Sequence, residues 1–115
     1  MTALSDATCL RRERFARRLP TTLADLTGPR HGTVRLPPHL AWSGLTAFDL
    51  DRPRLRMSCY RIVIGEAGRD DICRYLDRTL LLALWPTLRT LISRDIREVW
   101  EDAFPELGPA VRKAV

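Results

Sequence analysis

The chain has few of the signals that mark secreted or membrane proteins. Its 115 residues hold three cysteines, an odd number with neither C-x-x-C spacing nor the even count of a disulfide framework. The longest apolar run is the six residues 80–85, too short for a membrane-spanning helix. The N-terminus has no apolar leader. We therefore expect reduced thiols, a cytoplasmic location and no membrane association.

Lysine is nearly absent, because 18 of the 19 basic residues are arginine and Lys113 is the remaining one. Arginine-rich codon usage in a GC-rich genome produces such a bias without any functional demand. The net charge of +5 is uneven: residues 1–35 carry +4, residues 36–66 carry +1, and residues 67–115 carry none. The positive charge is therefore a property of the N-terminal part of the chain.

Catalytic and cofactor motifs are missing as well. There is no G-x-S-x-G, and the segment 28–32 lacks the Lys-Ser/Thr of a phosphate-binding loop. His31 and His39 do not form the spacing of a metal-binding pair, and the close pairs of aspartates are explained by helix capping and turns. We therefore predict a protein that is not an enzyme, with no catalytic residue, no metal and no cofactor.

The clearest pattern present is an apolar stripe in the last third of the chain. From Leu84 to Leu107 apolar residues recur at steps of three and four, which predicts an amphipathic helix. Pro86 suits the first helical position and Pro105 ends the stripe. We expect core helices at about 52–66, 70–84 and 86–104, with Ser93–Asp95 as a point where the last one could restart. The predicted fold class is all-α, a small helical bundle.

The segment before these helices is punctuated by proline and glycine and is predicted to be irregular. Thr33–Leu36 could be extended, and the alternation around Phe48 is a weak strand signal. Trp42 and Phe48 are expected to fold this segment onto the core. Residues 57–64 also suit a strand, but a helix is preferred because a lone strand would have no partner.

The uneven charge predicts three parts. Residues 1–30 form a flexible, partly disordered basic arm, residues 31–107 a single helical domain, and residues 108–115 a tail. Within the arm a short helix is expected from about Thr8 to Leu19. Four arginines share one face of that helix: Arg11, Arg14, Arg17 and Arg18.

Two functions are compatible with these patterns. The helix at 52–66 has two apolar faces, and the second face carries Met57, Tyr60 and Ile64, which we predict to bind a protein partner or a second copy of the chain. The chain would then be a regulatory, protein-binding module. The alternative is a small DNA- or RNA-binding regulator that uses the four arginines of the arm on phosphates.

Several stretches between His31 and Leu107 also carry a resemblance. They are HGTVRLPPHLAWSG, FDLDRPRLRMSCYRIVI, DDICRYLDRTLL, LWPTLRTL and VWEDAFPEL. In these the chain resembles a family of small, Arg-rich, largely uncharacterised actinobacterial proteins. Such proteins can be encoded beside nucleotidyltransferase-like toxins, so the resemblance implies an antitoxin-like partner of a toxin enzyme. It implies no active-site residue.

Overall fold

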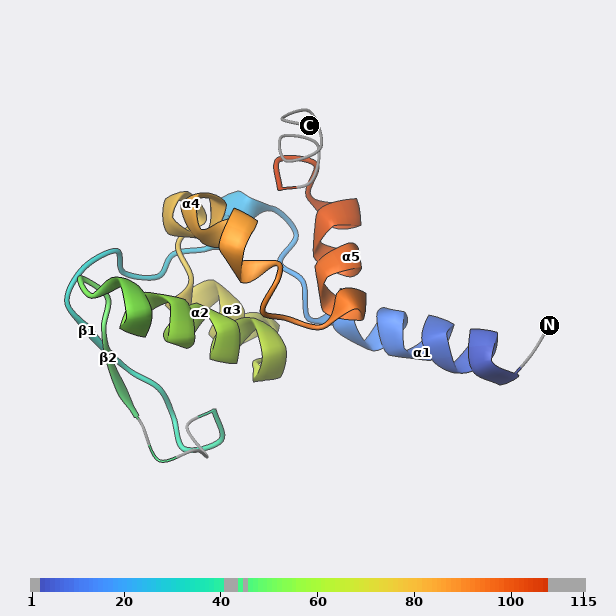
Figure 1. Ribbon diagram of the computed structural model, residues 1–115, viewed down its shortest axis with the longest axis horizontal. Helices are drawn as coiled ribbons and strands as arrows, with labels where there is room; N and C mark the ends of the chain where they lie inside the picture. The colour runs from blue at the N-terminus through green and yellow to red at the C-terminus, as the bar shows by residue number, and fades with distance from the viewer. Residues whose placement is uncertain (1–2, 41–43, 45, 108–115) are drawn as a thin grey trace.

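The computed structural model describes residues 3–40, 44 and 46–107, and over these residues the chain is mostly helical (Figure 1). The all-α prediction is confirmed in part, because a two-stranded antiparallel sheet accompanies the helices. The elements follow one another as α1 (Ala3–Arg17), a 3-10 helix (Leu23–Asp25), β1 (Thr33–Arg35), β2 (Ala47–Asp49), α2 (Pro53–Glu66), α3 (Arg69–Tyr75), α4 (Arg78–Leu88) and α5 (Arg94–Ala103).

The small sheet confirms the two extended pieces expected in the irregular segment. Val34 pairs with Phe48 across the strands, and both side chains are buried, whereas Arg35 is exposed. Gly32 precedes β1 with a φ of +80°, a conformation that glycine adopts without strain. Phe48 therefore anchors this segment to the core as expected, and the prediction for Trp42 lies outside the described residues.

The helix expected at 52–66 is present as α2, with Pro53 in its first turn. Asp51 does not cap it. The Asp51 carboxylate accepts a hydrogen bond from the Gly32 amide and contacts the His31 ring, and Arg52 occupies the N-cap position instead. Because residues 57–64 lie inside α2, the strand alternative for them is excluded.

The single helix predicted at 70–84 is wrong, because the chain breaks it at Leu76 and Asp77. Asp77 is the N-cap of α4, where its carboxylate accepts from the Leu80 amide at 3.0 Å. The residues around Gly28 pass against this break, and the Gly28 amide donates to the Leu76 carbonyl at 2.8 Å. A Cβ at Gly28 would lie 2.4 Å from the Tyr75 carbonyl carbon, so only glycine fits there.

The predicted start of the last helix, at residue 86, is also wrong. Helix α4 continues through Pro86 to Leu88, although proline cannot donate the amide hydrogen bond that helix geometry requires. The flanking Trp85 and Leu88 are buried, and their packing keeps the chain helical across the proline. The last helix begins later, at Arg94, where the Ser93 hydroxyl accepts from the Ile96 amide. The restart considered at Ser93–Asp95 is therefore the actual boundary.

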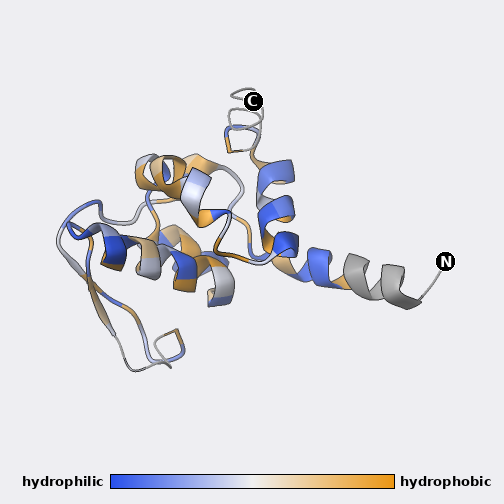
Figure 2. Cartoon of the chain, viewed as in Figure 1, coloured by the Kyte–Doolittle hydropathy of each residue, from blue (hydrophilic) through white to orange (hydrophobic). Residues whose placement is uncertain are grey.

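The core draws on residues from Leu19 to Leu107, and aromatic side chains join α4 to α5 within it. Trp85, Trp100 and Phe104 form an aromatic chain, with ring centroids 6.3 Å and 5.5 Å apart. Figure 2 shows α4 as largely apolar, while the side of α5 toward the viewer is hydrophilic. No helix in the described part of the chain is both long and apolar enough to cross a membrane.

The N-terminal region is more structured than expected. Helix α1 begins at Ala3 and ends at Arg17, rather than spanning Thr8–Leu19, and Figure 1 shows it projecting from the body beside the start of α5. Three leucines that the sequence placed in the basic arm are buried in the core: Leu19, Leu23 and Leu26. The chain after α1 therefore contributes to the same core as the helices of the C-terminal half.

Candidate partner-binding groove

The face of α2 predicted to bind a partner is mostly internal. Tyr60 is 0% exposed and Ile64 is 1% exposed, while Met57 is half-buried against the core. The Tyr60 hydroxyl accepts a hydrogen bond from the Asp77 amide at 2.9 Å, and burial raises the pKa of its phenol. A partner that leaves the fold intact cannot reach Tyr60 or Ile64.

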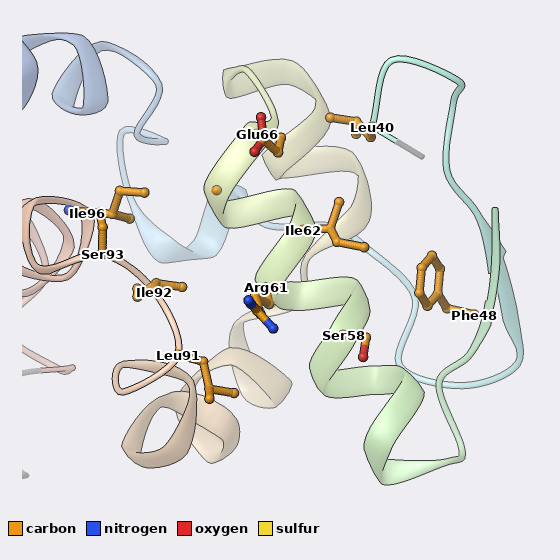
Figure 3. A pocket seen from close by; sticks show the side chains of 11 residues that line it. Leu40, Phe48, Ser58, Arg61, Ile62, Glu66, Leu91, Ile92, Ser93 and Ile96 are labelled. Carbon is orange, nitrogen blue, oxygen red and sulfur yellow. Dashed lines mark hydrogen bonds between the residues drawn. The ribbon is translucent and has the colours of Figure 1, made fainter. Parts of the chain in front are cut away.

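The other side of α2 borders an open groove with a cavity volume of about 470 Å³. One wall is the outer face of α2. The opposite wall is the chain segment that joins α4 to α5 together with the first turn of α5. Figure 3 shows Leu91, Ile92 and Ile96 on one side of Arg61, and Ile62 on the other side, toward Leu40 and Phe48. The groove residues are Leu40, Phe48, Ser58, Arg61, Ile62, Gly65, Glu66, Leu91, Ile92, Ser93 and Ile96.

The groove is apolar and partly open to solvent. Leu91 is 42% exposed, one of two large apolar side chains exposed among the residues whose burial is described. Ile62 and Ile92 are half-buried and pack on the core from opposite walls. Gly65 adds space, because a Cβ built on it would meet no atom within 4 Å. Such a surface leaves apolar area in water that a bound partner would cover.

The side chains that line the groove include one positive and one negative charge, Arg61 and Glu66. Glu66 interacts electrostatically with Arg18, whose guanidinium donates to the adjacent Gly65 carbonyl at 3.3 Å. Burial nevertheless lowers the pKa of Arg18, and the charge of Glu66 opposes that effect. Arg61 is exposed, and no acidic side chain of the described residues forms an ion pair with it. Arg61 is therefore a positive side chain of the groove with no ion pair among the described residues.

The four arginines predicted to bind nucleic acid do not form one free surface. Arg11 pairs with Asp95 at 3.0 Å. Arg18 lies over the Phe15 ring, 4.8 Å from its centroid, and is half-buried. Arg14 and Arg17 are exposed. Two of the four side chains are thus engaged by the chain itself, which reduces the charge available for phosphates.

Arg12, which is not one of these four arginines, joins α1 to α5. It pairs with Glu98 and, at 3.9 Å, with Asp95. The Arg94 guanidinium donates to the second oxygen of Glu98, and its hydrogen bond holds the pKa of Glu98 below its usual value. These contacts explain why α1 lies against the first turns of α5.

A second carboxylate of α5, Glu101, is buried and supports the wall of the groove. It accepts from the Trp85 indole at 2.9 Å and from the Arg89 Nε at 2.7 Å. The hydrogen bond to Glu101 raises the pKa of Arg89. Arg89 is the C-cap residue that follows α4. Its pair with Glu101 therefore fixes the start of the segment that carries Leu91 and Ile92.

The cysteines and histidines are the remaining candidate ligands and nucleophiles among the described residues. The described residues contain no group of three or more His, Cys, Asp or Glu side chains that could hold a metal ion. Burial raises the pKa of the Cys59 thiol to about 12, and burial raises that of Cys73 as well, so neither is a ready thiolate. His31 and His39 pair separately, with Asp51 at 3.1 Å and Asp71 at 2.9 Å.

The sequence pattern did not single out the groove. Leu91 and Ile92 fit the apolar stripe of a longer helix, so they were assigned to the core. The glycines at 65 and 68 indicate a break after the first core helix rather than space beside it. The one available signal is Gly65 within a helical pattern. Glycine lowers the stability of a helix interior, so its presence there indicates a packing or functional reason.

Comparison of the chain with models of protein families, with curated proteins and with solved structures found no match. The resemblance to small actinobacterial proteins stays a prediction.

Proposed function

We propose that the protein is a protein-binding module whose groove holds a helical segment of a partner protein. The observation that carries this proposal is the apolar groove between α2 and residues 91–96, with Leu91 exposed at its edge. Aliphatic walls with few charged groups favour a partner that buries apolar side chains.

The dimensions of the groove favour a helix as the bound element. Residues 58–66 of α2 cover about 12 Å, or roughly two turns, at the rise of an α-helix. A partner helix would place apolar side chains at i, i+3 and i+4 between Ile62 and Ile92, the arrangement of helix-in-groove complexes. The missing side chain at Gly65 lets a partner backbone approach α2 closely.

The test is site-specific photo-crosslinking in the native host. A benzoylphenylalanine at Ser58 lies in the groove, and the same residue at Thr79 lies on the exposed side of α4 as a matched control. We expect Ser58 to crosslink to a defined helical segment of one protein, identified by peptide mapping, and Thr79 not to do so.

A blocking variant makes this result specific to the groove. Gly65→Leu should extend a side chain into the open space above α2 and abolish the Ser58 crosslink while the circular dichroism spectrum stays unchanged. Equal crosslinking from Ser58 and Thr79, or a Ser58 crosslink that survives Gly65→Leu, would contradict the proposal.

A further inference from the structure

We propose that the helical segment bound in the groove is acidic, with a carboxylate that pairs with Arg61. This inference rests on the proposed function and names the chemistry of its partner. Its first support is position: Arg61 is one of the residues that line the groove, between Ser58 and Ile62 along α2, and Figure 3 shows it in the middle of the labelled side chains.

The second support is the lack of compensation around Arg61. Glu66, the acidic residue among those that line the groove, interacts electrostatically with Arg18 and forms no ion pair with Arg61. Asp95 and Glu98 of α5 are occupied by Arg11, Arg12 and Arg94. Arg61 has no acidic partner in the described part of the chain, so an incoming carboxylate gains an interaction that no described residue supplies.

The third support is the charge of the same helix face farther from the groove. Arg54 lies seven residues before Arg61, and this spacing returns to nearly the same side of an α-helix. Arg54 is exposed, and the described residues provide no ion pair for it. A partner helix that follows α2 beyond the groove therefore meets a second positive charge about 10 Å away.

The apolar walls decide between an acidic protein segment and other anions. A nucleic-acid backbone offers charge but no aliphatic surface to cover Leu91, Ile62 and Ile92. An amphipathic helix offers both, with an apolar stripe for the walls and a glutamate or aspartate beside that stripe for Arg61. The apolar walls thus supply most of the affinity for a partner helix. The charge of Arg61 makes the groove prefer an acidic helix over a basic one.

The experiment compares two helical peptides of about 16 residues that share one leucine stripe at i, i+4, i+7 and i+11. One carries glutamate and the other lysine at the positions that flank the stripe. Fluorescence polarisation with the full chain should show about 3- to 10-fold tighter binding of the glutamate peptide at low salt. Higher salt should reduce this ratio, because the Arg61 contact is exposed.

Charge reversal identifies the residue responsible. Arg61→Glu should reverse the preference between the two peptides. Arg74→Glu makes the same change of net charge at an exposed residue of α3 outside the groove, and should leave the preference in favour of glutamate. Leu91→Ala should weaken both peptides together, since it removes the apolar contact that they share without changing the charge of the groove.

The outcomes separate this inference from the proposed function. Equal affinity of the two peptides, or equal effects of Arg61→Glu and Arg74→Glu, overturns the acidic partner. Failure of both peptides to bind, or binding of the chain to anionic vesicles in their place, also overturns it. The proposed function survives any of these results if the Ser58 crosslink remains blocked by Gly65→Leu, and it fails with the inference if that crosslink is independent of the groove.

Discussion

Tyr60 and Arg61 are neighbours in α2, yet the first is completely buried and the second is exposed in the groove. The Tyr60 side is closed by the break between α3 and α4, where the Asp77 amide donates to the phenol oxygen. The Arg61 side meets the segment 91–96, which leaves an open groove. The two faces of one helix thus differ in what covers them: the chain itself closes the first, and the second is the face that we propose to bind a partner.

The largest expected effect is on the buried face. Tyr60→Ala should lower the free energy of unfolding by about 3–5 kcal/mol, because it removes a large side chain from a closed core. Tyr60→Phe keeps the ring but leaves the Asp77 amide without its acceptor, and should lower it by about 1–3 kcal/mol. Urea unfolding followed by circular dichroism measures both.

A control on the other face sharpens this result. Arg61→Gln should change the free energy of unfolding by less than about 0.5 kcal/mol, because the side chain is exposed and unpaired among the described residues. If Tyr60→Ala left stability unchanged and lost a partner instead, the internal position of Tyr60 would be contradicted.

The next effect compares two thiols at adjacent positions. Cys59 is buried, and burial raises its pKa to about 12, so almost none is thiolate at pH 8. A cysteine at Ser58 would stand in the groove with an ordinary pKa. With Cys9 and Cys73 replaced by serine, Ser58→Cys should react with Ellman's reagent at least about 100-fold faster than Cys59.

The dependence on pH provides the check. A rise from pH 7 to pH 9 should speed the reaction of Ser58→Cys toward a plateau, as an ordinary thiol ionises. Cys59 should stay slow over the same range, and should react freely only when urea unfolds the chain. Comparable rates for the two thiols in the folded protein would show that this side of α2 is open.

The fold was predictable where local patterns and tertiary contacts agree. Helix α2 follows from Pro53 and the apolar spacing after it, and Phe48 was correctly expected in the core. The helix boundaries failed where a tertiary contact decides them. Leu76 fits an uninterrupted apolar stripe, and only the buried position of Asp77 beside Tyr60 shows why the helix ends there.

The groove was less predictable than the fold, for a related reason. Its second wall depends on the end of α4 at Arg89, which Glu101 fixes from twelve residues away along the chain. Periodicity cannot show such a contact, and it placed Leu91 and Ile92 inside a continuous helix. The expected binding face was likewise assigned to Tyr60 because two apolar faces look alike until the covering elements are known.

The smallest expected effect comes from adding a single methyl group at Gly65. This change tests the stability of α2 and its proposed binding of a partner in one variant. Gly65 lies within the helix, and a Cβ there meets no atom within 4 Å, so Gly65→Ala should raise the free energy of unfolding by about 0.5–1 kcal/mol. The same substitution at Gly68, the N-cap of α3, should give no such gain, because alanine is a poor residue at that position.

The methyl group added at Gly65 would also occupy the groove, so Gly65→Ala should weaken binding of the glutamate peptide while it stabilises the chain. Thermal unfolding and fluorescence polarisation on one preparation measure both quantities, and a variant that gains stability with unchanged affinity would show that no partner backbone approaches α2 at this glycine.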